Sequence, residues 1–172
     1  MNWRSFRHEA MATEFEIALA GKSEDYARQA AGAAWRDLDR LEGDLSRFVE
    51  SSDIARANRM ARGETIAIGE DTVQCLLAAA KWSAATERAF DPSYASDRAA
   101  VLKPDEALFA LDPAAHQLTS FSARLCLDLG AVGKGYALDR MAAVLDEWGI
   151  GMACLQSGGI GVLCRRRRQC VL

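Results

Sequence analysis

The sequence lacks several features that would place it in a common class of protein. None of its apolar runs approaches the roughly 20 residues that a membrane-spanning helix needs. Its first residues, 1–9, contain no continuous apolar segment of the kind found in a secretion signal. We therefore expect a cytoplasmic protein without a membrane span.

Neither charge nor cysteine dominates the composition. The 172 residues carry a formal net charge of −3, which argues against nucleic-acid binding driven by overall charge. The five cysteines show no CxxC spacing, so neither a disulfide framework nor a zinc site is expected. Cys75, Cys126 and Cys154 lie in apolar runs, and we expect them to act as small core residues.

The hydrophobic pattern predicts alternating helices and strands. Residues 11–20 alternate apolar and polar side chains, which predicts a half-buried strand, and residues 27–48 show the spacing of a long amphipathic helix. Further helices are predicted near 73–84, 105–111 and 137–148, and further strands near 65–68, 116–120, 124–128 and 152–155. We expect 116–120 and 124–128 to pair as a hairpin. The order favours an α+β fold with a mainly antiparallel sheet and packed amphipathic helices.

The stretch from Leu127 to Asp139 carries the most chemistry. It contains three glycines around Lys134, followed by a helical pattern. Glycine lets backbone N–H groups approach a ligand, lysine adds positive charge, and a following helix would direct its N-terminal dipole to the same place. These parts favour a phosphorylated ligand. The spacing fits neither a P-loop nor a dinucleotide fingerprint, and an ordinary strand-to-helix turn is the plainer alternative.

Several separated segments resemble one family. They are Ala10-Met-Ala-Thr13, Leu45-Ser-Arg-Phe48, Ser52-Asp-Ile54 with Asn58, Ala89-Phe-Asp-Pro92, Leu127 to Asp139, and Ser157-Gly-Gly159. In this order the chain resembles the N-terminal part of ApbE-type FAD:protein FMN transferases, the flavin transferase family.

The resemblance implies both a reaction and a site. The reaction is magnesium-dependent transfer of the FMN moiety of FAD onto a threonine hydroxyl of an acceptor protein, with release of AMP. The implied FAD contacts are Met11, Phe48, Ala89, Phe90, Asp91, Asp128 and Lys134. Lys134 would also act in catalysis by neutralising charge on the transferred phosphate. The backbone carbonyl of Ala131 would be a ligand of the magnesium ion.

Plainer interpretations exist for several of these residues. Phe48 and Phe90 could stack on the rings of the ligand, but they could also pack in the core. Asp91 stands before Pro92 and could simply form a turn. Asp128 could cap the residues that follow it through their backbone N–H groups.

The end of the chain departs from the family pattern. Members are commonly longer, and the resemblance implies an aspartate and a threonine further along that complete the metal site. Residues 160–172 contain no Asp, Glu or Thr, but include four consecutive arginines at 165–168. We therefore expect the N-terminal part of an ApbE-like domain over 1–161 and a basic irregular tail over 162–172, without the C-terminal part. An exposed sheet edge would favour a homodimer. The alternative function is a catalytically inactive remnant that binds flavin or a partner.

Overall fold

The protein is described by a computed structural model over residues 2–97, 107–158 and 161–166, the last range as backbone only. The chain forms two compact units, one from Met1–Glu42 with Lys134–Leu172 and the other from Gly43–Gly133. Each unit contains its own antiparallel sheet. The predicted α+β fold is therefore confirmed.

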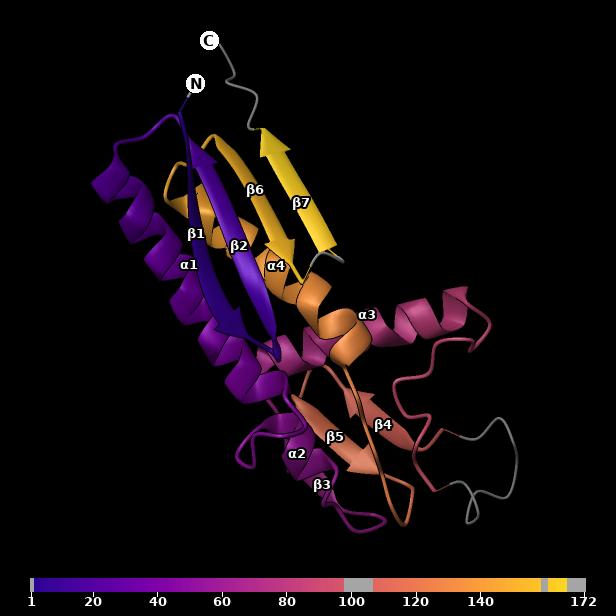
Figure 1. Ribbon diagram of the computed structural model, residues 1–172. Coiled ribbons are helices and arrows are strands. Elements are labelled where there is room, and N and C mark those ends of the chain that lie inside the picture. Colours follow the sequence, from indigo (N-terminus) through magenta and orange to yellow (C-terminus); the bar gives the residue numbers. More distant parts are fainter. Residues whose placement is uncertain (1, 98–106, 159–160, 167–172) are drawn as a thin grey trace. The chain divides into compact units, whose positions relative to one another are not determined.

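The first unit is a four-stranded sheet with two long helices. The strand order is β1-β2-β6-β7, and every neighbouring pair is antiparallel. The elements are β1 (Trp3–Ala10), β2 (Thr13–Ala20), β6 (Met152–Ser157), β7 (Gly161–Arg166), α1 (Glu24–Leu45) and α4 (Gly130–Glu147). Figure 1 shows α1 and α4 lying along the same face of this sheet. By these bounds the last residues of α1, 43–45, and the first residues of α4, 130–133, belong to the second unit.

The alternation predicted for β2 determines which face of the sheet is covered. Phe15 and Ile17 are fully buried, and each such side chain stabilises the fold by roughly 1.5–3 kcal/mol. His8 of β1 lies opposite Phe15 in the register and stacks on Trp35 of α1, with ring centroids 5.2 Å apart. Helix α1 therefore covers the face on which the apolar side chains of β2 lie.

The long predicted helix is present as α1. Its first turn begins after Ser23, whose hydroxyl accepts a hydrogen bond from the backbone N–H of Tyr26 at 3.4 Å. Glu24 and Asp25 lie in the first turn, where their negative charges interact favourably with the positive end of the helix dipole. No helix among the described residues is long and apolar enough to cross a membrane.

The first strand of the sheet was not predicted from the sequence. Charged residues such as Arg7 and Glu9 alternate with half-buried ones along β1 and obscure its apolar face. The predicted strand at 11–20 starts later, at Thr13, because Met11 and Ala12 form the two-residue turn between β1 and β2. Their φ angles are 50° and 57°, as in the turns whose twist suits a tight hairpin.

The second unit contains a three-stranded sheet in the order β3-β5-β4. Its elements are α2 (Asp53–Ala57), β3 (Thr65–Ala67), α3 (Glu70–Ala85), β4 (Phe109–Asp112) and β5 (Gln117–Ser120). The partner of β5 in the hairpin is β4, so the predicted pairing with 124–128 is wrong. Asp112 stabilises the turn between β4 and β5, because its carboxylate accepts hydrogen bonds from the N–H groups of Ala114 and Ala115, both at 3.0 Å.

Two further local predictions are corrected. The helix expected near 105–111 is wrong for residues 109–111, which pair with β5; residues 105 and 106 lie outside the described residues. The tail expected to be irregular from residue 162 instead continues as β7 to Arg166, because the edge of β6 pairs with it from Met152 to Ser157. Residues 167–172 lie outside the described residues, and the domain boundary at 161 stays a prediction.

Candidate functional site

The glycine-rich stretch is helical rather than a loop. Helix α4 starts at Gly130, so Gly133 and Gly135 lie inside its first two turns. The carbonyl of Leu129 accepts hydrogen bonds from the N–H groups of Val132, at 3.0 Å, and Gly133, at 2.6 Å. The predicted cradle of glycine N–H groups is wrong to that extent, because the helix itself uses the N–H of Gly133. The positive end of the helix dipole still lies directly after Asp128.

Asp128 caps the start of α4. Its Oδ1 accepts a hydrogen bond from the N–H of Gly130 at 2.8 Å, and a Cβ at Gly130 would come within 3.1 Å of the same oxygen. Glycine at this position therefore permits the close approach. The other carboxylate oxygen lies 3.6 Å from Nε of Arg47. The capping interpretation of Asp128 is confirmed, and its contact with FAD stays a prediction.

The chain just before Asp128 is held from two sides. The side-chain oxygen of Asn58 accepts from the N–H of Leu127 at 2.6 Å, and the amide nitrogen of Asn58 donates to the Leu127 carbonyl at 3.0 Å. The N–H of Asp128 donates to the carbonyl of Pro92 at 2.8 Å. The structure thus brings the predicted segments around Asn58, Asp91-Pro92 and Asp128 together within the second unit. Asn58 lies in a segment that resembles the family, but its clamping role was missed.

The segment Ala89-Phe-Asp91 is shaped by a turn. Oδ1 of Asp91 accepts hydrogen bonds from the N–H and the hydroxyl of Ser93, at 2.8 and 2.7 Å, so the turn interpretation of Asp91 is confirmed. The N–H of Phe90 donates to the hydroxyl of Thr86 at 3.1 Å, and the Phe90 ring is only half-buried. Ala89 is exposed. Contact of these three residues with FAD stays a prediction.

Phe48 does not pack in the core. Its side chain is 80% exposed, which is unusual for a phenylalanine, so the plain packing interpretation is wrong for this residue. The guanidinium carbon of Arg47 lies 4.6 Å from the centre of the Phe48 ring. The same guanidinium approaches Asp128, so Arg47 connects two residues that the sequence predicted for the site. Arg47 itself was missed, although it lies in the matching segment Leu45–Phe48.

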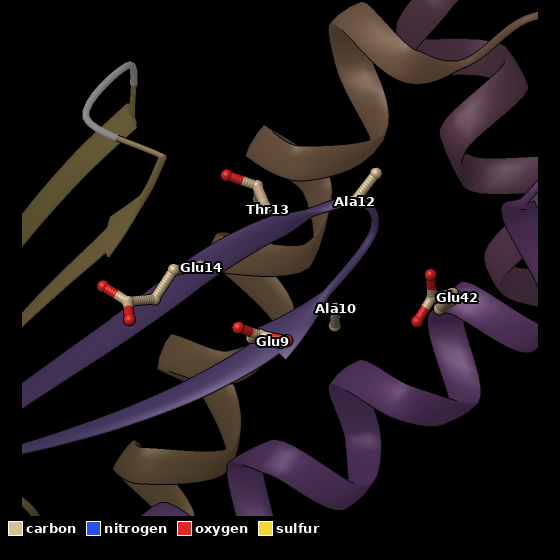
Figure 2. Close-up of a pocket in the computed structure, with 6 residues that line it drawn as sticks. All are labelled: Glu9, Ala10, Ala12, Thr13, Glu14 and Glu42. Carbon is tan, nitrogen blue, oxygen red and sulfur yellow. The ribbon is translucent and has the colours of Figure 1, made fainter.

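The predicted contact Met11 lies in the first unit, in the hairpin turn. Its N–H donates a hydrogen bond to Oε1 of Glu42 on α1 at 2.9 Å. Beside the turn lies an open cavity of about 470 Å³. Its lining residues are Glu9, Ala10, Ala12, Thr13, Glu14 and Glu42. Figure 2 shows Glu42 facing the hairpin turn from the helix. Three carboxylates make this cavity unfavourable for phosphate and suited to a group that donates hydrogen bonds.

A glycine packs closely against the same turn. Gly158 follows β6 with φ of +54°, and its N–H donates to the carbonyl of Glu14 at 2.9 Å. A Cβ at this position would overlap the hydroxyl oxygen of Thr13. The predicted turn at Ser157-Gly158 therefore needs glycine for two reasons, its left-handed φ and its contact with Thr13. Gly159 lies outside the described residues.

The described residues do not by themselves fit a magnesium ion. Ala131 is exposed in the first turn of α4, where its carbonyl could offer one oxygen. In the ranges 2–97 and 107–158 no three acidic, histidine or cysteine side chains gather in a way that could hold a metal. Magnesium requires near-octahedral oxygen coordination, so one carbonyl is insufficient. The role of Ala131 stays a prediction, and Lys134 lies one turn into the same helix.

Of the three cysteines expected in the core, the expectation is confirmed for Cys75. Cys75 on α3 is buried, and this burial, with a smaller contribution from the negative charge of Asp71, raises the pKa of its thiol to about 12. A thiol with so high a pKa stays protonated at neutral pH and is a poor nucleophile. Cys126 and Cys154 are half-buried.

Comparison with known proteins identifies similar chains. The sequence profile of the ApbE family matches residues 11–167. The fold is similar to that of an ApbE protein from Thermotoga maritima, with a TM-score of 0.79 and 20% identity over 95% of this chain and 59% of that one. The flavinyl transferase ApbE of Pseudomonas stutzeri, in its apo form, gives a TM-score of 0.79 and 20% identity over 95% and 56%.

A third solved structure extends this likeness. A variant of the flavin transferase ApbE from Vibrio cholerae gives a TM-score of 0.80 and 17% identity over 96% of this chain and 63% of that one. The chain therefore spans between 56% and 63% of the length of these three relatives. A search of the curated proteins finds no significant match.

Proposed function

The chain belongs to the ApbE family, and from that premise we propose that it takes part in flavin transfer. In this proposal it binds FAD and moves the FMN moiety onto a threonine of an acceptor protein. The observation that carries the proposal is the family match over residues 11–167, which includes every residue predicted for the site.

The reaction needs a nucleophile, a phosphorus centre and a leaving group. The threonine oxygen of the acceptor forms a bond to the phosphorus of the FMN half. The bond from that phosphorus to the bridging oxygen breaks, and AMP leaves with that oxygen. The hydroxyl proton of threonine passes to a base or to solvent. Such a transfer leaves little covalent work for the protein, so positioning and charge neutralisation carry the catalysis.

The predicted roles agree with the chemistry of the residues in and before α4. Asp128 ends the clamped segment and lies at the N-terminus of the helix, where the dipole favours an anionic ligand. Lys134 lies one turn further and would supply positive charge for the pyrophosphate. Magnesium, when bound, would add Lewis-acid charge neutralisation, and in this proposal the Ala131 carbonyl would be one of its ligands.

A second candidate function is flavin binding without transfer. The observation that favours it is that, in the described part of the chain, no three acidic, histidine or cysteine side chains gather in a way that could hold a metal. A catalytic magnesium ion needs several oxygen ligands. The half-buried Phe90 and the exposed Phe48 would still be suited to stack on a flavin or adenine ring.

One experiment separates the two functions. The purified chain is mixed with FAD, magnesium and an acceptor protein that carries a target threonine, and the acceptor is weighed by mass spectrometry. A gain of one FMN less one water supports transfer, and an acceptor with valine in place of that threonine is the control. If the acceptor mass stays constant while flavin fluorescence still changes on titration, the second function holds. If Lys134→Ala leaves FAD affinity untouched, the assignment of Lys134 is wrong.

A further inference from the structure

Arg47 lies between two residues predicted to contact the ligand. Its guanidinium carbon is 4.6 Å from the centre of the Phe48 ring, and its Nε is 3.6 Å from a carboxylate oxygen of Asp128. Phe48 follows Arg47 directly, whereas Asp128 comes from a segment that Asn58 and Pro92 hold in place. Two contacts from separate parts of the second unit thus orient one charged side chain.

The nitrogen donors of Arg47 are open to an outside acceptor. The 3.6 Å separation from Asp128 is an ion pair but exceeds the usual length of an N–H···O hydrogen bond. Among the described residues no acceptor forms a hydrogen bond with the Arg47 guanidinium, and its side chain is 38% exposed. A structural arginine usually donates to carbonyls or carboxylates of its own chain, as Arg56 does to Asp53 at 2.9 Å.

These observations point to a ligand with paired anionic oxygens. The planar guanidinium presents its donors as a fork that matches phosphate geometry. We propose that Arg47 binds a phosphate of FAD, oriented for this by Phe48 and Asp128. The inference rests on the proposed function and adds to it a phosphate-binding residue outside α4. The ion pair and the ring contact reduce the conformational entropy that the arginine would otherwise lose on binding.

The test compares two flavins that share a ring system and differ in phosphate. FAD and riboflavin are titrated into the wild-type chain and into Arg47→Met, Arg47→Lys and Arg62→Met, with fluorescence as the readout. Arg62 is an exposed arginine of the same unit, so Arg62→Met removes the same charge as Arg47→Met and serves as the control. We expect Arg47→Met to weaken FAD binding by about tenfold or more and to leave riboflavin binding unchanged. Arg47→Lys should fall in between, because lysine keeps the charge but lacks the fork.

Each result bears on the inference. Equal weakening of FAD and riboflavin in Arg47→Met would mean that Arg47 only supports the shape of the site, and would overturn the inference. Unchanged FAD affinity would overturn it too, while leaving the proposed function intact. A wild-type chain that binds no FAD would overturn both together. Circular dichroism on each variant confirms that it is folded, as expected for a side chain this exposed.

Discussion

The segment Leu127-Asp128 and the turn Met11-Ala12 both carry predicted flavin contacts, yet they are held in opposite ways. Hydrogen bonds from Asn58 and to Pro92 hold the first, which has no residue with a positive φ. The turn consists of two non-glycine residues with φ of 50° and 57°, a conformation that costs roughly 1–2 kcal/mol per residue. The pairing of β1 with β2 must therefore stabilise the turn.

The two segments also differ in charge. The guanidinium of Arg47 lies 3.6 Å from Asp128, whereas the cavity beside the hairpin turn is lined by Glu9, Glu14 and Glu42. We therefore expect a phosphate to bind nearer the first segment than the second. We expect the cavity to accept an uncharged, donor-bearing part of a ligand.

The largest expected effect comes from Gly158, which packs against Thr13 after the turn. Gly158→Ala forces a side chain into a left-handed conformation and into the Thr13 hydroxyl. We expect the free energy of unfolding to fall by about 2–4 kcal/mol, measured by urea denaturation. Gly151→Ala is the control, because no atom lies within 4 Å of the added Cβ. Equal losses in the two variants would contradict the close packing at Gly158.

The clamp on Leu127 is tested by Asn58→Leu, which has a similar size and no hydrogen-bonding groups. The change leaves the N–H and carbonyl of Leu127 without their partner, so we expect a loss of about 2 kcal/mol in the free energy of unfolding. Hydrogen exchange at the Leu127 amide should accelerate. Asn58→Asp keeps the acceptor and should protect that amide better than Asn58→Leu. Unchanged exchange in both variants would argue against the clamp.

The core of the second unit can be tested through Cys75, whose pKa is raised to about 12 by burial. In the unfolded chain the thiol ionises near 9.0, while in the folded chain it stays protonated. The unfolded state therefore binds fewer protons above that pH, and stability falls between pH 9 and 12 by up to about 1.4 kcal/mol per pH unit. Cys75→Ala should remove this part of the pH dependence, measured by denaturation at several pH values. An identical slope in the variant would count against the burial effect.

The smallest expected effect concerns the strain in the turn. Ala12→Gly relieves a left-handed alanine, but glycine also gains freedom in the unfolded chain, so we expect a net gain of about 0.5–1 kcal/mol. The control, Ala18→Gly in strand β2, should lose a similar amount, because glycine weakens a strand. Thermal denaturation of both variants measures this difference in sign. A loss in Ala12→Gly would show that the turn is not strained.

Elements with a strong local pattern were predicted well. Helix α1 and strand β2 follow directly from the spacing of apolar residues, because each buries one regular face. Strand β1 was missed because its Arg7 and Glu9 carry no apolar signal, and its partner β2 supplies most of the buried face. The wrong hairpin at 124–128 has a similar cause, because the choice between two apolar partners for β5 depends on long-range pairing.

The site shows the same division between local pattern and long-range contact. The sequence predicted a helix after the glycines around Lys134, but the helix already begins at Gly130, and the Leu129 carbonyl accepts hydrogen bonds from its first turn. Asp91 and Asp128 were predicted from motifs, and both also form the plain turns that their residue type favours. Arg47 and Glu42 were missed, because the charged and polar groups that they contact, at Asp128 and Met11, are distant from them in sequence.

Residue type and spacing were thus sufficient for the α+β class and the ApbE family, since these depend on local patterns of apolar residues and on short motifs. The clamp of Asn58 on Leu127, the placement of Arg47 on Phe48 and Asp128, and the close fit of Gly158 to Thr13 depended on the folded chain. Several of these contacts join segments that are far apart in the chain, as Thr13 and Gly158 are. The local sequence pattern does not reveal these contacts, because they form only when strand pairing and packing bring the segments together.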